Sequence, residues 1–271
     1  MNHLIIDASK TKVSLNIKEL RAYKDLFLIL AYKDFRVRYA QTFIGLLWAV
    51  LQPLATLVIF TLIFGIAIKI DTGGIEYPLF ALTGMTAWTY FSFVMSQSGN
   101  SIIGAQDMVK KIYFPRLIIP LSKSLVGMVD FAIMMVFVFA LMVYYQYPPT
   151  INLLFLPAFI FLTIMVSLSV GIWLSALTIR YRDFQHVVPF IVQFGLYATP
   201  IAYPTSIIPD KYLGFYYLNP VAGVVEGFRW AILGTPFHFS YSCISYAIVF
   251  FLFITGLYYF RKVEKVMADI V

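Results

Sequence analysis

Residues 32–53 read YKDFRVRYAQTFIGLLWAVLQP, a basic and aromatic cluster that runs directly into an apolar segment. The charges stop at Arg38, and residues 45–68 contain no Asp, Glu, Lys or Arg. A helix that crosses a bilayer needs about 20 apolar residues, and Lys and Arg concentrate in cytoplasmic loops. The stretch therefore predicts a first membrane span with its preceding segment in the cytoplasm.

The composition indicates an integral membrane protein. Of the 271 residues, 61% are hydrophobic and 12% are charged, and the mean hydropathy is +0.84. A soluble domain of this length could not bury so much apolar surface. The net charge of +7 would suggest nucleic acid in a soluble protein, but here it fits the basic bias of cytoplasmic loops. We expect no nucleic-acid partner.

Two further features narrow the class. The single cysteine, Cys243, excludes an intrachain disulfide and a cysteine-based metal cluster. Residues 1–44 carry many charges and no apolar region followed by small residues. We therefore expect no cleaved signal peptide, and we expect the first span to anchor the chain.

Six apolar segments are candidates to cross the membrane, so we predict an all-α integral membrane protein with six transmembrane helices. They are Gly45–Ile68, Leu79–Ile103, Leu117–Tyr145, Leu153–Ile179, Val187–Ala202 and Cys243–Phe260. The fifth is short and lies between prolines, so its ends are the least defined.

The distribution of basic residues predicts the orientation. Seventeen of the 20 Lys and Arg residues fall on one side of these spans, in residues 1–44, 110–123, 180–182 and 261–265. Only Lys69, Lys211 and Arg229 remain for the other side. We therefore expect a multi-pass protein of the cytoplasmic (inner) membrane with both termini in the cytoplasm.

Two segments outside the spans have their own patterns. Residues 17–40 place Leu20, Tyr23, Phe27 and Leu30 at helical spacing, which predicts an amphipathic helix in the cytoplasmic interface or a simple surface anchor. Residues 203–242 are apolar and aromatic but broken by Pro and Gly. Two short helices that dip into the outer leaflet fit this external segment best, and they are candidates to close a pore.

Familiar catalytic motifs are missing from the sequence. The dipeptide Gly-Lys never occurs, so the chain has no phosphate loop and cannot hydrolyse ATP by that route. The three histidines, His3, His186 and His238, lie far apart, and neither H-E-x-x-H nor G-x-S-x-G occurs. We therefore expect no metal site and no catalytic residues.

Asp130 is the one acidic residue well inside a predicted span. An intramembrane carboxylate suggests a functional site, and a proton relay is one reading. The other is a neutral or hydrogen-bonded carboxyl that faces the helix bundle, in the direction of Lys123. A proton-coupled carrier usually has more than one such group, which favours the second reading.

Three more sets of residues have both a functional and a plain interpretation. The stretch Gln106–Arg116 is either a short helix that docks on a cytosolic partner or an ordinary basic loop. Arg36, Arg38, Arg180 and Arg182 suit phosphate or pyrophosphate, or else anionic lipid head groups. Aromatic residues, 18% of the chain, suit the C–H faces of sugars, although packing against lipid is the commoner role of any single one.

Four stretches, in this order and spacing, carry a resemblance. They are Lys33–Pro53, Lys110–Pro120, Tyr181–Pro209 and Tyr217–Gly234. Together they resemble the membrane subunit of ABC-2-type exporters of cell-surface polysaccharides, the Wzm-type O-antigen permeases and their teichoic-acid and capsule relatives. The similarity covers nearly the whole chain.

The resemblance implies a single transmembrane domain over residues 1–271 whose homodimer encloses a pore. Two copies of a separate Wzt-type ATPase subunit would bind ATP and Mg, and this chain would bind no cofactor. The cargo would be a lipid-linked polysaccharide, first of all an O-antigen, and the chain itself would be no enzyme.

The resemblance also implies roles for individual positions. Residues 104–116 would be a cytoplasmic coupling helix that meets the ATPase, through Gln106, Asp107, Lys110, Lys111, Tyr113 and Phe114. The interface helix at residues 17–40 would touch the ATPase too. Residues 203–234 would form re-entrant gate helices on the outside, with Pro204, Tyr217, Asn219, Pro220, Glu226 and Arg229. The pore aromatics would be Phe43, Trp48, Trp88, Tyr90, Phe93 and Tyr197. The lipid-pyrophosphate end would meet Arg36, Arg38, Arg180 and Arg182.

Other functions remain as alternatives. A related ABC-2 exporter of another lipid or a drug is the nearest one, and substrate competition would separate it. A proton-driven flippase would depend on Asp130. A membrane-embedded transferase would need an acid, base or metal site that the sequence does not offer.

Overall fold

The computed structural model describes residues 17–39, 45–265 and 267. In this part of the chain the secondary structure is helical, and it contains no strand. The elements are α1 (Ile17–Ala22), α2 (Lys24–Tyr39), η1 (Gly45–Leu47), α3 (Trp48–Phe60), η2 (Thr61–Ala67), α4 (Tyr77–Asn100), η3 (Ile103–Ala105), α5 (Gln106–Lys111), α6 (Ile118–Tyr144), η4 (Ile151–Phe155), α7 (Leu156–Arg180), α8 (Phe184–Ala198), η5 (Thr205–Ile207), α9 (Asp210–Tyr216), α10 (Pro220–Leu233) and α11 (Phe239–Glu264).

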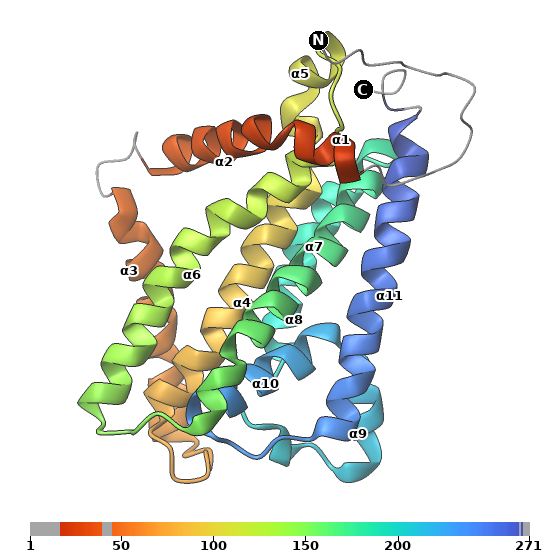
Figure 1. Cartoon of the computed structure of the whole chain (residues 1–271). Coiled ribbons are helices and arrows are strands. Elements are labelled where there is room, and N and C mark those ends of the chain that lie inside the picture. Colours follow the sequence, from red (N-terminus) through yellow and green to blue (C-terminus); the bar gives the residue numbers. More distant parts are fainter. Residues whose placement is uncertain (1–16, 40–44, 266, 268–271) are drawn as a thin grey trace.

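Four helical segments of the described residues are long and apolar enough to cross a membrane. They are Trp48–Ala67, Ile118–Tyr144, Ile151–Arg180 and Phe239–Glu264. They match four of the predicted spans, with ends that differ by a few residues. α4 is long enough, but its serines, threonines and glycines make it less apolar, and α8 has only 15 residues. Figure 1 shows both within the same bundle. Because α4 and α8 are not among the four segments that are both long and apolar enough, the count of six spans stays a prediction.

α4 is the centre of the bundle, and most of its side chains are buried. Its hydroxyl groups are satisfied locally, because Thr83 donates to the carbonyl of Leu79 and Thr86 to that of Leu82, each at 2.8 Å. Such bonds matter where no water can replace them. α7 approaches closely at Gly171, where an added Cβ would lie 2.7 Å from Cβ of Ser98. Small residues thus bring these two helices together.

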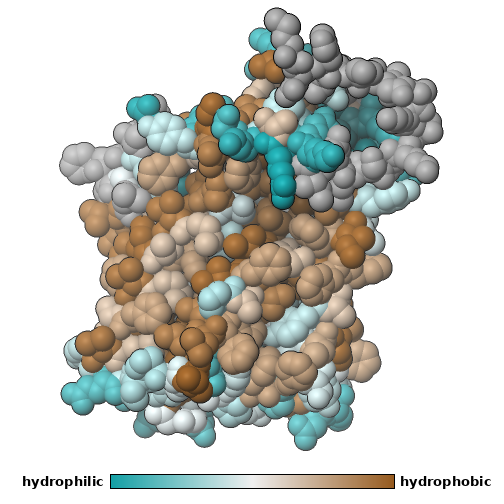
Figure 2. Space-filling view, in the orientation of Figure 1, coloured by the Kyte–Doolittle hydropathy of each residue, from teal (hydrophilic) through white to brown (hydrophobic). Residues whose placement is uncertain are grey.

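The exterior has the polarity of a membrane protein. Figure 2 shows a broad band of hydrophobic side chains around the middle of this face, with hydrophilic groups gathered toward both ends. Large apolar side chains such as Val136, Val143 and Phe251 are more than 60% exposed, and α6 and α11 contribute them. An apolar exterior of this kind is stable in lipid but not in water.

The interface helix predicted at residues 17–40 is observed as α1 and α2, with a break at Tyr23; residue 40 lies outside the described residues. Figure 1 shows α2 lying across one end of the bundle, nearly perpendicular to the long helices. Leu20, Tyr23, Phe27 and Leu30 pack against the hydrophobic core, as their spacing predicts. The helix therefore has one face on the bundle and one face away from it.

The segment predicted to hold two short external helices contains α9 and α10. Asn219 begins α10 with a cap in which its side chain accepts a hydrogen bond from the amide of Val221 at 3.0 Å, and Pro220 occupies the first turn. Gly234 ends the helix with φ of +66°, a conformation that suits glycine. Nearly all of α10 is buried, at the end of the bundle opposite α2 (Figure 1).

Candidate functional site

A cavity of about 460 Å³ lies between four helices of the bundle. α3, α4, α6 and α8 line it, and Arg38 reaches it from α2. On each helix the lining positions repeat at helical spacing, as with Met85, Trp88, Ser92 and Ser96 of α4. One face of each helix thus contributes to a single site.

The aromatic residues predicted to line a pore gather in this cavity. They are Trp48, Trp88, Tyr90, Phe93 and Tyr197. Phe43, the sixth of that set, lies outside the described residues. Trp88 and Tyr90 are buried at 5% and 2% exposure, whereas Trp48 and Tyr197 are 54% and 60% exposed, so the cavity opens on one side.

Neutral polar groups alternate with these rings. They are Gln52, Thr56, Thr89, Ser92, Ser96 and Gln193. Their amide and hydroxyl groups can both donate and accept hydrogen bonds. The sequence reasoning missed this set, although Thr89, Ser92 and Ser96 repeat at helical spacing within one predicted span, a pattern that could have found them.

Gly195 shapes the wall of the cavity. A Cβ at this position of α8 would lie 2.5 Å from Cη2 of Trp88, so the indole ring occupies the space that a side chain would take. The ring also packs against Phe91, with centroids 5.2 Å apart. Glycine therefore allows α8 to close against the tryptophan of α4.

Asp130 is held by α2. Arg38 forms an ion pair with it, with Nη2 2.6 Å from Oδ2, and the hydroxyl of Tyr39 donates to Oδ1. The structure confirms the expectation of a hydrogen-bonded carboxyl that faces the bundle, but the expected direction toward Lys123 is wrong. Lys123 pairs with Asp34 of α2 instead. Sequence reasoning did not identify Tyr39 or Asp34 as partners, because no local pattern relates them to α6.

A second cavity, about 350 Å³, lies beneath α2. Asp34, Val37, Arg38, Phe93, Gln97, Lys123 and Val126 line it. Arg38 and Phe93 line both cavities, so these two side chains stand at the boundary between them.

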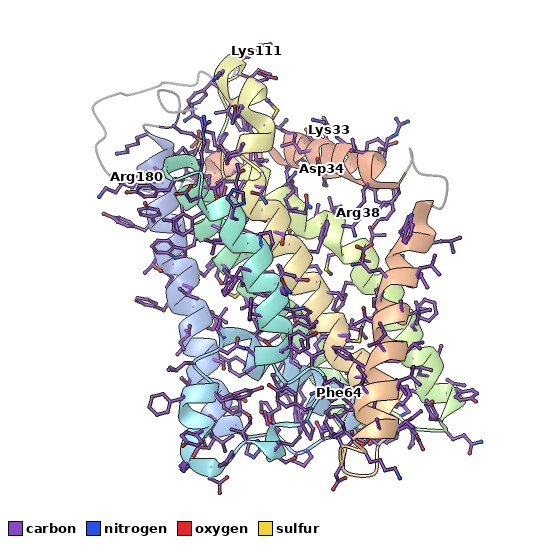
Figure 3. The ribbon with its side chains drawn as sticks, turned by 180° about the vertical axis from the view of Figure 1, so that it is seen from behind. Lys33, Asp34, Arg38, Phe64, Lys111 and Arg180 are labelled. Carbon is purple, nitrogen blue, oxygen red and sulfur yellow. The ribbon has the colours of Figure 1, made fainter. Side chains whose placement is uncertain are left out.

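The four arginines predicted to receive a pyrophosphate do not meet in the described structure. Arg36 is exposed beside Tyr32, on the opposite face of α2 from Arg38, because residues two apart on a helix do not face the same way. Arg180 and Arg182 are exposed at the turn between α7 and α8. Figure 3 shows Arg180 and Arg38 at opposite sides of the molecule, with Lys33 directed away from the bundle. Of the four, only Arg38 lines a cavity described here.

α5 projects beyond the bundle, as Figure 1 shows. Asp107, Lys110, Lys111 and Tyr113 are exposed there, and Gln106 is half-buried. Phe114 differs from the expectation that it meets a partner, because only 3% of it is exposed and it packs into the hydrophobic core. Its burial fixes the direction in which the chain enters α6.

Two of the predicted gate residues, Glu226 and Tyr217, belong to a buried polar cluster. The carboxylate of Glu226 accepts hydrogen bonds from Thr205 and Tyr217, and His238 Nδ1 lies 3.1 Å away. Burial and the bond to Glu226 raise the pKa of Tyr217, so the phenol stays protonated and donates. Thr205 and His238 were not singled out from the sequence.

Arg229 does not pair with Glu226. Its guanidinium donates to the carbonyls of Phe80 (3.2 Å), Pro200 and Ile201, and it stacks 3.6 Å from the ring centroid of Phe80. It thereby joins α10 to α4 and to the chain after α8. Asn219 reaches the same chain at Thr199 Oγ1, 2.9 Å away, and Pro204 lines a cavity of about 150 Å³ beside Glu226.

A polytopic helical membrane protein with a polar and aromatic cavity between its helices has the architecture of a transporter. The ABC-2 type transporter family matches residues 25–233 of this chain, and the chain belongs to that family.

Several characterised proteins are similar over most of their length. The O-antigen export system permease protein RfbA of Klebsiella pneumoniae is 28% identical over 247 residues, 91% of this chain and 95% of that protein. RfbA of Myxococcus xanthus is 25% identical over 215 residues, 79% and 82% of the two chains. The polysialic acid transport protein KpsM of Escherichia coli is 25% identical over 246 residues, 87% and 92%.

Proposed function

We propose that this chain is the membrane subunit of an ATP-driven exporter that moves a lipid-linked polysaccharide across the cytoplasmic membrane. An O-antigen is the first candidate cargo, since two of the relatives named above are O-antigen export permeases, and another surface polysaccharide such as polysialic acid is the second. Polymer would leave the cytoplasm through a pore between two copies of the chain.

The cavity is the observation that carries this proposal. Rings of Trp88 and Phe93 beside neutral amides and hydroxyls match the two kinds of surface on a sugar, its C–H face and its hydroxyl groups. The charged groups in the lining, Arg38 and Asp130, neutralise each other. A cavity of this chemistry offers a polysaccharide many weak contacts, which suits a polymer that must slide.

The open side of the cavity supports a homodimer. Trp48 of α3 and Tyr197 of α8 line the cavity and are exposed beside it. The same two helices expose Leu51, Ile59 and Phe190. A second copy packed on this face would cover these side chains and turn two lateral cavities into one enclosed path.

A separate ATPase subunit would drive the movement. The chain contains no phosphate loop, and α5 and the loop after it offer the exposed Lys110, Lys111 and Tyr113 at the proposed cytoplasmic end. ATP and Mg would bind to the partner, which must bind two states of this dimer with different affinity if it is to move them. α9 and α10 would close the far end of the path.

Co-purification with a candidate partner ATPase from the same organism is the experiment that tests the proposal. We expect a complex of two copies of each chain that hydrolyses ATP. Lys110→Glu/Lys111→Glu should weaken it, because the charges of the docking helix are reversed. Phe114 is left in place, since replacing it would disturb the core.

A matched control carries the same charge change at the opposite end. Lys69→Glu/Lys211→Glu should leave the complex intact. A chain that stays alone and binds no ATPase would overturn the proposal. Export into vesicles that follows a proton gradient instead of ATP would favour a carrier based on Asp130.

A further inference from the structure

Arg38 stands between the two cavities described above. Its side chain is 34% exposed and lines both the aromatic cavity of about 460 Å³ and the cavity of about 350 Å³ beneath α2. Its guanidinium lies 4.0 Å from the ring centroid of Phe93, which lines the same two cavities. A ligand that passes from the cavity beneath α2 to the aromatic cavity must therefore move past Arg38 and Phe93.

The guanidinium of Arg38 has unused hydrogen-bonding capacity. Nη2 is 2.6 Å from Asp130, but Nη1 is buried and has no hydrogen-bond partner among the residues that the structure describes. A guanidinium presents five N–H donors in a planar fork, and a buried donor without an acceptor is costly. An acceptor that reaches this side of Arg38 would thus be favoured before any existing bond is broken.

The cavity beneath α2 contains a second ion pair. Lys123 and Asp34 line it and bind each other, and Asp34 lies one turn from Arg38 on α2. The two pairs fasten α2 to α6, where Lys123 and Asp130 lie seven residues apart. Two cations and two carboxylates leave this seam without net charge, so a multiply charged anion meets no excess of positive charge unless a pair opens.

We propose that the Arg38–Asp130 ion pair is a latch that a phosphoryl head group displaces. The anion enters beneath α2 and takes Arg38 and Lys123 from their carboxylates, and α2 then loosens from α6. Arg38 moves with the anion, which clears the boundary beside Phe93. This inference rests on the proposed function, in which the cargo carries a lipid phosphate or pyrophosphate at one end.

Asp130 acts in this latch as an internal competitor. A phosphoryl group has more charge and more acceptor oxygens than a carboxylate, and a guanidinium binds it in a bidentate manner. The carboxylate nevertheless lowers the net affinity and returns Arg38 when the anion leaves. A transporter needs this property, because a head group that binds too tightly would not be released.

The latch gives the two members of the ion pair opposite effects on anion binding. Arg38→Gln removes the binding group and should lower the affinity for a polyprenyl pyrophosphate by about tenfold or more. Asp130→Asn removes only the competitor and should raise the affinity for the same ligand by about tenfold. Asparagine has the shape of aspartate and can still accept the hydrogen bond of Tyr39. If the pair were only a structural tether, neither change would strengthen binding.

The test measures binding of geranylgeranyl pyrophosphate to the full chain in nanodiscs. Trp48 and Trp88 line the aromatic cavity, so their fluorescence is one readout. Geranylgeraniol, geranylgeranyl monophosphate and inorganic pyrophosphate are the comparison ligands. Glu264→Gln is the matched control, since it also removes a carboxylate from a cytoplasmic ion pair, with Arg261 at 2.9 Å, but lies at neither cavity.

Opposite shifts for Arg38→Gln and Asp130→Asn, with no shift for Glu264→Gln, would support the latch. Shifts in the same direction, or none, would overturn it. Inorganic pyrophosphate that binds as tightly as the lipid would support a latch opened by a soluble anion. If wild type exports polymer with its ATPase but the affinity shifts are absent, the latch is wrong and the proposed function stands. If the affinity shifts occur but no polymer is exported, the latch stands and the proposed function is wrong.

A second measurement follows the helices and keeps the proposal testable if a variant binds poorly. Spin labels at Lys33 of α2 and Val136 of α6, both exposed, report the distance between these helices once Cys243 is replaced by serine. We expect the distance distribution to broaden with geranylgeranyl pyrophosphate and in Asp130→Asn, but not with geranylgeraniol. An unchanged distribution would overturn the release of α2.

Discussion

The carboxylate of Glu264 accepts a hydrogen bond from the backbone amide of Arg116 at 2.8 Å, and the Arg116 side chain donates to the carbonyl of Glu264 at 2.7 Å. These reciprocal bonds join the start of α6 to the last turn of α11. Partial burial and the nearby carboxylates of Glu19 and Glu264 raise the pKa of Tyr113, so that phenol also remains neutral in this region. The loop after α5 is therefore anchored to the end of the chain that the structure describes.

Loss of this anchor should loosen the loop. Glu264→Ala removes the acceptor of the Arg116 amide and the ion pair with Arg261, and we expect a loss of about 1–2 kcal/mol in stability. Hydrogen exchange of residues 106–117 should become faster. Glu264→Gln keeps an acceptor oxygen, so its hydrogen-exchange rate should lie between those of wild type and Glu264→Ala.

An exposed acidic residue of α5 provides the control for this prediction. Asp107→Asn should leave the exchange rate of the loop unchanged, because no described hydrogen bond joins its side chain to α11. Equal acceleration in Asp107→Asn and Glu264→Ala would show that general charge, and not this anchor, orders the loop.

Gly195→Ala should destabilise the wall of the cavity. The new Cβ would lie 2.5 Å from the buried ring of Trp88, and overpacking of this kind costs about 1–3 kcal/mol. The expected result is a lower unfolding temperature and a shifted tryptophan emission. Gly214→Ala is the control: a Cβ there meets none of the described residues within 4 Å, so the unfolding temperature of this variant should stay near that of wild type.

Arg229→Lys should be more damaging than its charge suggests. A lysine ammonium cannot bind the three carbonyls that the guanidinium fork reaches, and unsatisfied buried carbonyls should cost at least about 3 kcal/mol. Thermal unfolding in detergent measures the loss. Lys211→Met, which removes an exposed cation at the same end of the molecule, should change little. Similar losses in both variants would contradict the role assigned to Arg229.

The neutral polar lining should matter for export and not for assembly. Gln193→Leu and Thr56→Val each remove hydrogen-bonding groups from the cavity, and a loss of about 0.5–1.5 kcal/mol per bond corresponds to a few-fold slower export. Export of polymer into vesicles, with the amount of assembled complex held equal, is the measurement. Phe161→Leu, at an exposed site of α7, should export at the rate of wild type.

Hydropathy and helical spacing predicted much of the architecture. Four of the predicted spans coincide with helices long and apolar enough to cross a membrane, and the interface helix packs through Leu20, Tyr23, Phe27 and Leu30. Proline and glycine in residues 203–242 correctly indicated short helices. These features are local, because residues within one or two turns determine them.

Contacts between distant elements could not be predicted in this way. The sequence indicated that Asp130 faces the bundle, but its partners lie on α2, and only the angle at which α2 crosses α6 brings Arg38 and Tyr39 to it. Phe114 is an aromatic residue beside basic ones, a pattern that suits docking on a partner, yet the turn into α6 buries it.

The sequence by itself therefore determined that this chain is a helical membrane protein and where its apolar segments and its short helices lie, because hydropathy and periodicity act along the chain. Only the tertiary structure decided that aromatic rings share a cavity with neutral polar groups, and that Arg38 stands at its boundary with the cavity beneath α2. Those relationships arise from helix crossings, which depend on how complementary side chains such as Gly195 and Trp88 pack together.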